Sequence, residues 1–211
     1  MSPPIPDNTA LQTRFAAVSV HDVSEKKLPS GKTLIFETPS SADRRKALRD
    51  ASKTHPLTVR RILTASGNED SISVEIRSKH IIGCLAEVFK DYRAVQVVSS
   101  PVVLSEFRPL IHRFQNIWRW AYDDQRTIEE RKDVEQLLSF ICVELEEEFR
   151  EFREVQESVE VTYSTLWACF IPGDIVVEAS NDYTECYKVL GYTEEKDFFK
   201  MQCKTQWCRP S

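Results

Sequence analysis

The chain has 211 residues, of which 41% are hydrophobic and 29% are charged, and its formal net charge is −5. This composition is typical of a globular domain, and it excludes a wholly disordered chain, a collagen-like fibre and a polytopic membrane protein. The mild acidity also argues against general nucleic-acid binding, because neutralisation of phosphates is the main source of that affinity.

The charge is unevenly spread along the chain. Residues 1–61 carry 11 basic and 6 acidic side chains, whereas residues 123–160 carry 5 basic and 14 acidic ones. The sequence begins with no signal peptide, and no apolar run is long enough to span a membrane. We therefore expect an intracellular protein, cytoplasmic or nuclear, whose six cysteines are reduced.

Residues 1–56 are rich in proline, serine and threonine, which predicts a flexible, mildly basic N-terminal tail. Within it, Lys32–Glu37 is a short candidate strand, and the basic cluster Arg44–Arg49 fits one turn of a solvated helix. Gly31-Lys32-Thr33 copies the end of a P-loop, but Lys26 stands where the first glycine of that loop belongs. No nucleotide site is predicted there.

From Leu57 onward the patterns indicate regular structure. The segments LTVRRIL and SISVEIRS alternate in hydrophobicity around the turn sequence SGNEDS, which predicts a β-hairpin. Ser78 is a candidate N-cap for a helix from Lys79 to about Tyr92. Val95–Val98 is a short candidate strand, and a further helix is expected from about Ser105 to Tyr122.

The second half begins with a capping box formed by Thr127 and Glu130, which opens a predicted amphipathic helix of about 30 residues. A short helix at Tyr163–Phe170 and three strands in a β-meander follow. Segregated helices and strands indicate the α+β class for residues 57–211, as a single domain. Because the chain stops directly after a strand, we expect this domain to be incomplete at its C-terminus.

Residues that could carry chemistry are scarce. The four histidines lack the spacing of metal ligands, and Cys203 and Cys208 have no second pair of ligands nearby. His80 and Cys84 lie four residues apart on a predicted helix, which fits an ordinary helix-surface pair better than a nucleophile and its base. The sequence predicts no catalytic residue, no cofactor and no metal in this chain.

Two features predict an interaction surface. Trp118 and Trp120 lie beside Arg113 and Arg119, and this aromatic group fits core packing, a protein interface or a stacking platform for nucleic acid. We expect Trp120 and Tyr122 to be exposed. The candidate surface combines these two aromatic residues with the acidic end of the long helix, namely Glu146, Glu147, Glu148, Glu151 and Glu154.

One motif is more specific. It reads LW-x-x-F-x-P-G-x-x-V and consists of Leu166, Trp167, Phe170, Pro172, Gly173 and Val176. This motif resembles the signature of a domain of unknown function that precedes the AAA+ ATPase core in large fungal AAA-family proteins. The order of elements over residues 57–205 is also similar. The motif contains no chemically reactive group, so we interpret its residues as structural.

The resemblance implies a non-catalytic accessory domain that recruits substrates or adaptors, and hence protein partners rather than a membrane. ATP would be involved only through a C-terminal ATPase core, and no residue of this chain matches one. The alternative is a nucleic-acid-binding module that uses the basic N-terminal segment with Arg113 and Arg119.

Overall fold

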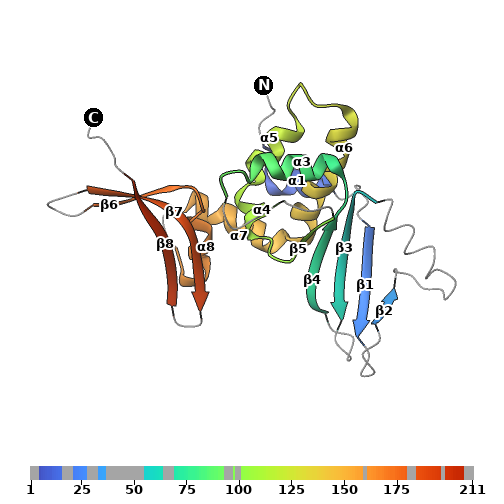
Figure 1. The fold of residues 1–211 in the computed structure, drawn as a ribbon, viewed down its shortest axis with the longest axis horizontal. Helices are drawn as coiled ribbons and strands as arrows, with labels where there is room; N and C mark the ends of the chain where they lie inside the picture. Colours follow the sequence, from blue (N-terminus) through green and yellow to red (C-terminus); the bar gives the residue numbers. More distant parts are fainter. Residues whose placement is uncertain are drawn as a thin grey trace.

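A computed structural model describes residues 5–15, 21–27, 33–36, 55–63, 69–92, 97, 101–158, 161–179, 184–195 and 198–206. The protein has the α+β architecture expected from its sequence. A five-stranded sheet carries a layer of helices, and a separate three-stranded sheet lies at the other end of the molecule (Figure 1). Among the described residues, no helix is both long and apolar enough to span a membrane.

The larger sheet has the strand order β2-β1-β3-β4-β5. Its strands are β1 (His21–Lys27), β2 (Thr33–Phe36), β3 (Leu57–Leu63), β4 (Glu69–Ile76) and β5 (Val102–Leu104). Strand β1 runs parallel to β3, and the other neighbours are antiparallel. The predicted hairpin is confirmed as β3 and β4, and its register places Val59 opposite Val74 in the core.

The prediction of a flexible N-terminal tail is wrong for the described part of residues 1–56, although the short strand expected at Lys32–Glu37 is confirmed as β2 (Thr33–Phe36). Helix α1 (Asn8–Phe15) buries Leu11 and Phe15, and the main-chain carbonyl of Phe15 accepts a hydrogen bond from Ser139 at 3.2 Å. Strands β1 and β2 extend the sheet at the open edge of β3. Two apolar residues four apart suffice to dock one helix face, but they are too few to stand out in a proline-rich sequence.

The helical layer begins with α3 (Lys79–Val88), and the predicted N-cap is confirmed, since Ser78 Oγ accepts hydrogen bonds from the amides of His80 and Ile81. The helix expected at Ser105–Tyr122 is instead two helices, α4 (Arg108–His112) and α5 (Phe114–Ala121), separated at Arg113. The strand expected at Val95–Val98 lies outside the described residues except Val97, which is not in a strand. A strand that we did not predict, β5, pairs with β4 instead.

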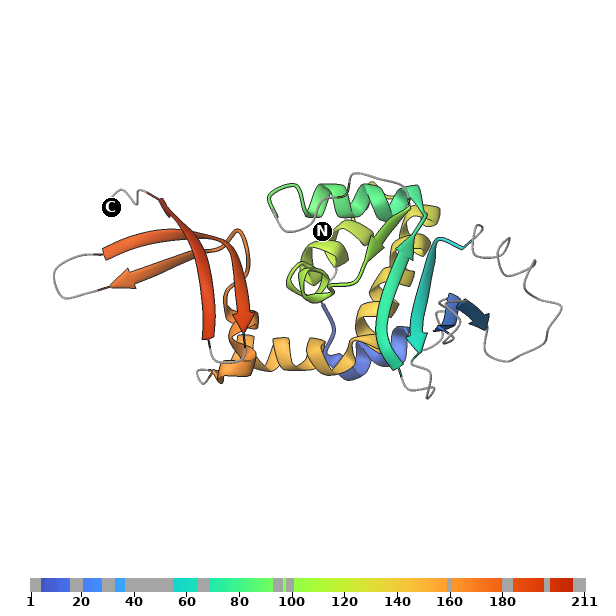
Figure 2. The same cartoon turned by 60° about the horizontal axis from the view of Figure 1, so that its bottom comes forward.

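The long helix is interrupted. Helix α6 (Ile128–Ser139) starts at the predicted capping box of Thr127 and Glu130, which is confirmed. A π-helical turn, η2 (Phe140–Glu144), follows, and α7 (Glu146–Glu157) continues in a different direction, as Figure 2 shows. Phe140, Ile141 and Cys142 are consecutive and all buried. A straight α-helix on the surface buries only the residues along one side, so the interruption at η2 allows all three side chains to enter the core.

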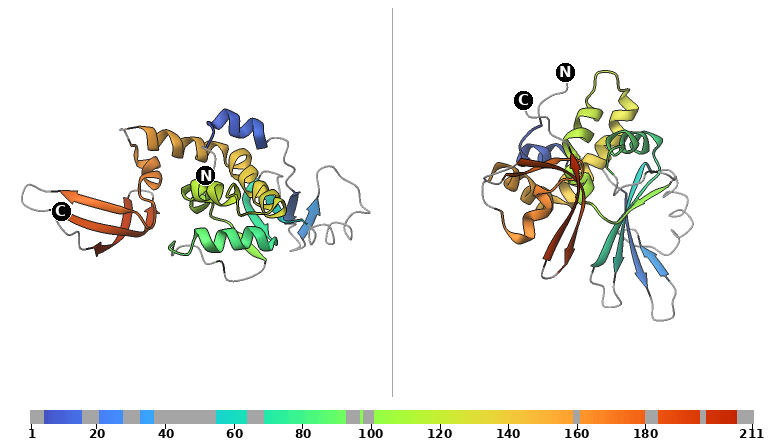
Figure 3. Two further views of the ribbon diagram at one scale, coloured as in Figure 1. Left: turned by 90° about the horizontal axis from the view of Figure 1, so that it is seen from above. Right: turned by 60° about the vertical axis from the view of Figure 1, so that its left-hand side comes forward.

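Helix α7 leads to the smaller sheet, as both views of Figure 3 illustrate. A 3₁₀ turn, η3 (Tyr163–Thr165), and α8 (Leu166–Cys169) precede the turn at Pro172-Gly173. The predicted meander is confirmed as β6 (Ile175–Ala179), β7 (Thr184–Glu195) and β8 (Phe198–Gln206), in the antiparallel order β6-β7-β8. A bulge at Val189–Gly191 shifts the register of β7 against β8.

The cysteines depart from the expected uniform reduced state. Cys84, Cys142, Cys169 and Cys203 are free thiols, whereas Cys186 on β7 is disulfide-bonded. Burial raises the pKa of Cys142 to about 12, so this thiol stays protonated and unreactive at neutral pH.

Candidate functional site

The acidic part of α7 forms an exposed surface. Glu146, Glu147, Glu148 and Glu154 are exposed and Glu151 is half-exposed. Among the described residues, only Glu154 of these five makes an ion pair, with Arg150 at 3.8 Å. We call these five carboxylates the α7 acidic face. Because their charges are held in water, they are available to a partner without a large desolvation cost.

Trp120 and Tyr122 do not belong to this surface, and the prediction that they are exposed is wrong. Their exposed fractions are 8% and 6%. Trp120 Nε1 donates a hydrogen bond to Glu87 at 2.8 Å, and the Arg126 guanidinium lies 4.0 Å from the centre of its ring. Trp120 is covered by Glu87 of α3 and by Arg126 of the loop between α5 and α6, which the α5 sequence alone does not reveal.

Tyr122 is also held by polar contacts, which come from α1 and α6. Its hydroxyl donates to Glu135 at 2.7 Å and accepts a hydrogen bond from Arg14 on α1, also at 2.7 Å. The Arg14 guanidinium also lies over the Tyr122 ring, 4.7 Å from its centre. Tyr122 therefore ties α1, α5 and α6 together.

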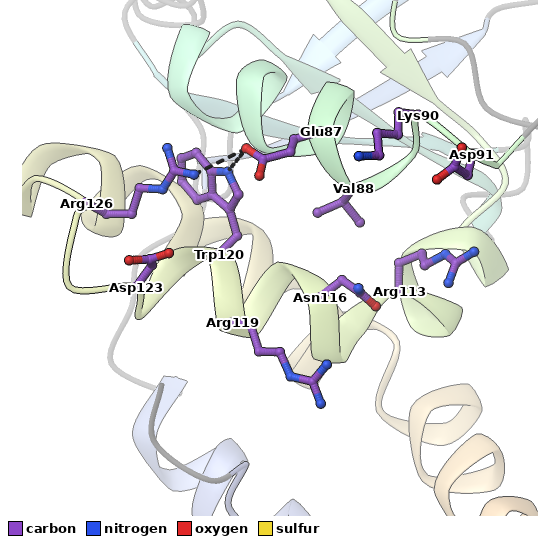
Figure 4. Close-up of a pocket in the computed structure, with 10 residues that line it drawn as sticks. All are labelled: Glu87, Val88, Lys90, Asp91, Arg113, Asn116, Arg119, Trp120, Asp123 and Arg126. Carbon is purple, nitrogen blue, oxygen red and sulfur yellow. Dashed lines mark hydrogen bonds and ion pairs between the residues drawn. The ribbon is translucent and has the colours of Figure 1, made fainter. Parts of the chain in front are cut away.

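The buried Trp120 forms part of a polar cleft of about 390 Å³ between α3 and α5. Figure 4 shows Glu87, Trp120 and Arg126 joined at one end of it, with Asn116 and Lys90 toward the other. Four basic and three acidic side chains line the cleft. The lining residues are Glu87, Val88, Lys90, Asp91, Arg113, Asn116, Arg119, Trp120, Asp123 and Arg126. Sequence reasoning missed this cleft, because its two walls come from separate segments with no shared motif.

The arginine and aromatic patch offers no stacking platform for nucleic acid. Trp118 is only 1% exposed, and Trp120 is covered by Arg126. Arg113 donates a hydrogen bond to the carbonyl of Pro172 at 2.9 Å and lies over the Tyr92 ring. Of the three interpretations, core packing is the one that describes Trp118. The basic cluster Arg44–Arg49 lies outside the described residues.

His112 is buried where the helical layer meets the smaller sheet. Its Nε2 donates to the carbonyl of Trp167 at 3.0 Å, and its Nδ1 accepts a hydrogen bond from the Tyr92 hydroxyl at 2.9 Å. Since a carbonyl can only accept, the single proton of the neutral ring is on Nε2. Burial lowers the pKa of His112 to about 4, with smaller contributions from Arg113 and Arg108, while the bond to Trp167 opposes the shift.

The other chemically suggestive groups also have structural roles. Cys84 is fully buried, and burial raises the pKa of its thiol far above the ordinary value. His80 lies 2.9 Å from a carboxylate oxygen of Asp133, to which Ser78 donates at 2.5 Å. Because Ser78 donates to Asp133 and not to His80, these three residues do not form the serine–histidine–aspartate relay of hydrolases.

Within the described part of the chain, no group of three or more histidine, cysteine, aspartate or glutamate residues is arranged to hold a metal ion. The segment that imitates a P-loop lies outside the described residues except for Thr33, the first residue of β2.

The residues of the LW-x-x-F-x-P-G-x-x-V motif lie near His112, where the helical layer meets the smaller sheet. Trp167 is buried and stacks on Phe152 with ring centres 6.0 Å apart, while Phe170 packs on Phe199 at 5.8 Å. Gly173 has a φ of +103°, and its amide donates to Val189 at 2.8 Å. Pro172 is buried, and Leu166 and Val176 are half-buried. All these contacts are consistent with a structural interpretation of the motif.

Comparison with known proteins finds no match for this chain among family models, proteins of curated function or solved structures. The resemblance to the fungal AAA-associated domain therefore stays a prediction from the motif.

Proposed function

We propose that this chain is a non-catalytic protein-binding domain, and that the α7 acidic face receives a basic segment of its partner. The observation that carries the proposal is the set of five exposed or half-exposed carboxylates on one helix, four of them without an ion pair among the described residues. The motif at residues 166–176 adds support, because the family that it resembles is expected to recruit substrates or adaptors.

The spacing of these carboxylates suits a basic polypeptide. Glu147, Glu151 and Glu154 are separated by four and three residues, so they lie along one side of α7. At 1.5 Å per residue, this row is about 10 Å long. Lysines at every second position of an extended peptide are about 7 Å apart, so two or three of them can meet the row together.

The structural roles of the chemically suggestive groups support binding rather than catalysis. His112 is neutral and fully engaged, Cys84 is buried with a raised pKa, and Ser78 is an N-cap. A nucleophile needs a positioned base and a site for the reacting atom, and these three residues supply neither.

The test is binding of a lysine–serine repeat peptide to the full chain, with a glutamate–serine repeat as the probe control. The double variant Glu147→Gln/Glu151→Gln removes two charges from α7 without changing side-chain size. Since an exposed ion pair contributes about 0.2–1 kcal/mol, we expect Kd for the lysine peptide to rise about 2- to 30-fold.

The matched control is Glu106→Gln/Glu129→Gln, which removes two exposed carboxylates outside α7. It is expected to bind the lysine peptide with a Kd close to that of the parent chain. If both double variants lose the same affinity for the lysine peptide, binding depends only on the net charge of the chain, and the assignment to α7 is wrong.

A further inference from the structure

Helices cover one face of the smaller sheet, and several side chains on the opposite face are exposed. Tyr192 on β7 stacks on Phe199 of β8, with ring centres 5.1 Å apart, and Tyr192 lies 6.4 Å from the His112 ring of the helical layer. Val189, on the same side, is 1% exposed. The helices therefore pack against the Tyr192 side of the sheet. Phe170, which directly follows α8, also lies on this side, 5.8 Å from Phe199, and Figure 1 shows α8 close to the sheet.

The strand register identifies the side chains of the opposite face. Ile175 on β6 pairs with Lys188 on β7, which pairs with Lys204 on β8. Directly paired residues of antiparallel strands point to the same side of the sheet, and alternation adds Val177 and Lys200 to this side. We call Ile175, Val177, Lys188, Lys200 and Lys204 the lysine face.

The lysine face is amphipathic, and its charged residues with described side chains are lysines. The same register also places Cys186, which is 6% exposed and disulfide-bonded, and the position of Glu195 on this side of the sheet. Ile175 and Val177 are 47% and 59% exposed, Lys200 and Lys204 are exposed, and Lys188 is half-exposed. Among the described side chains, none of these lysines makes an ion pair, and the acidic residues Glu178, Glu185 and Glu194 fall on the opposite side by register. Exposed aliphatic residues between unpaired lysines are a surface suited to an acidic partner with apolar contacts.

The α7 acidic face matches this description in charge and in spacing. Lys200 and Lys204 are four residues apart on β8, or about 13 Å along the strand. The carboxylates of Glu147 and Glu154 are about 10 Å apart along the helix, and flexible lysine side chains accommodate the difference. Val143, 43% exposed, lies in the π-helical turn η2 just before α7 and is an exposed apolar residue near the start of the α7 acidic face.

A chain cannot place its own α7 on its own lysine face. Helix α7 packs against α8 and the helical layer, which lie on the covered side of the smaller sheet. In Figure 2, α7 runs from the helical layer up to this sheet and ends before it. The matching acidic surface must therefore come from another molecule, and a second copy of this chain supplies one.

We propose that the lysine face binds the α7 acidic face of a second copy, so that the protein self-associates head to tail. This proposal rests on the proposed function, because it names the basic partner of the α7 acidic face. Each molecule then contributes one acidic and one basic surface to the contact, which is a heterologous interface and extends into a ring or a chain of copies.

The experiment is sedimentation velocity on the full chain at 1 to 100 µM in low salt, with two double variants. Glu147→Gln/Glu151→Gln weakens the acidic face, and Lys188→Gln/Lys204→Gln weakens the lysine face. We expect concentration-dependent assembly of the parent chain, and about 2- to 30-fold weaker assembly of each variant alone, since each loses two exposed ion pairs. The control Glu106→Gln/Glu129→Gln is expected to assemble like the parent.

Mixing the two variants tests the head-to-tail arrangement directly. In a 1:1 mixture, the intact lysine face of one variant meets the intact acidic face of the other, so a heterodimer forms and growth stops there. Circular dichroism melts of each variant confirm that both are folded. A mixture that stays monomeric would overturn the proposal, and so would a parent chain that is monomeric at 100 µM in low salt.

These results are distinguishable from a failure of the proposed function. If the parent chain is monomeric while Glu147→Gln/Glu151→Gln still loses affinity for the lysine peptide, α7 binds basic segments and only the self-association is refuted. If the lysine peptide binds all variants equally, the proposed function fails, and the head-to-tail contact fails with it.

Discussion

The fold should lose stability in mildly acidic solution, because His112 is protonated more readily in the unfolded chain than in the folded one. The ring is 6% exposed and lies among Tyr92, Phe152, Trp167 and Tyr192, with both nitrogens engaged. A proton on Nδ1 would point at the Tyr92 hydroxyl, and Nδ1 could then no longer accept the hydrogen bond from that hydroxyl. The folded state therefore favours the neutral ring, whereas the unfolded chain imposes no such preference.

The magnitude follows from the two pKa values. Burial lowers the pKa of His112 from an ordinary value of 6.5 to about 4. Because the folded pKa is the lower one, the unfolded state binds the proton first as the pH falls, and stability is lost between pH 6.5 and pH 4. The full loss is about 3 kcal/mol, of which about 2 kcal/mol has appeared at pH 5. Above pH 7 this contribution to stability is fully present.

The assay is urea unfolding of the full chain and of His112→Gln at pH 7.5 and pH 5.0. Carboxylates elsewhere titrate in both proteins, so the difference between the two pH-dependent losses isolates His112. We expect the parent chain to lose about 2 kcal/mol more than the variant over this interval. Equal losses in the two proteins would refute the reasoning, even if His112→Gln is less stable at both pH values.

Three further predictions concern stability. Trp120→Ala should lower the free energy of unfolding by about 3–5 kcal/mol, because the indole is buried; a stable variant in urea titration would mean that Trp120 is exposed in solution. Gly173→Ala should cost more than about 1 kcal/mol, because φ is +103° and a Cβ would lie 2.9 Å from Arg113; an unchanged thermal midpoint would contradict this geometry. Thr127→Ala should cost about 1 kcal/mol through loss of the capping box, measured by guanidinium unfolding of the variant and the parent chain; equal midpoints would contradict it.

Much of the local structure could be read from the sequence. The N-cap at Ser78, the capping box at Thr127, the β3–β4 hairpin and the turn at Pro172-Gly173 all appear where they were predicted. Each depends on residues within a few positions of one another, so the pattern and the interaction that it encodes lie in the same short segment. The α7 acidic face was also predictable, because a dense run of glutamates on a helix cannot be buried.

Tertiary contacts decided the remainder. Helix α1 is part of the core because Leu11 and Phe15 meet η2 and α6, more than 100 residues away in the chain. Trp120 is buried because Glu87 and Arg126 close over it, and the long helix turns at Phe140 because three consecutive residues find space in the core.

The lysine face has the same origin. Its five residues come from three strands, and only the pairing of those strands brings them to one side of the sheet. By itself, the sequence determined where some elements begin, such as α3 after Ser78 and α6 after Thr127, and which stretches are acidic, because those properties depend on neighbouring residues. Which side chains are covered, and which distant ones share a surface, was decided by packing, because burial depends on residues that are close in space and far apart in the chain.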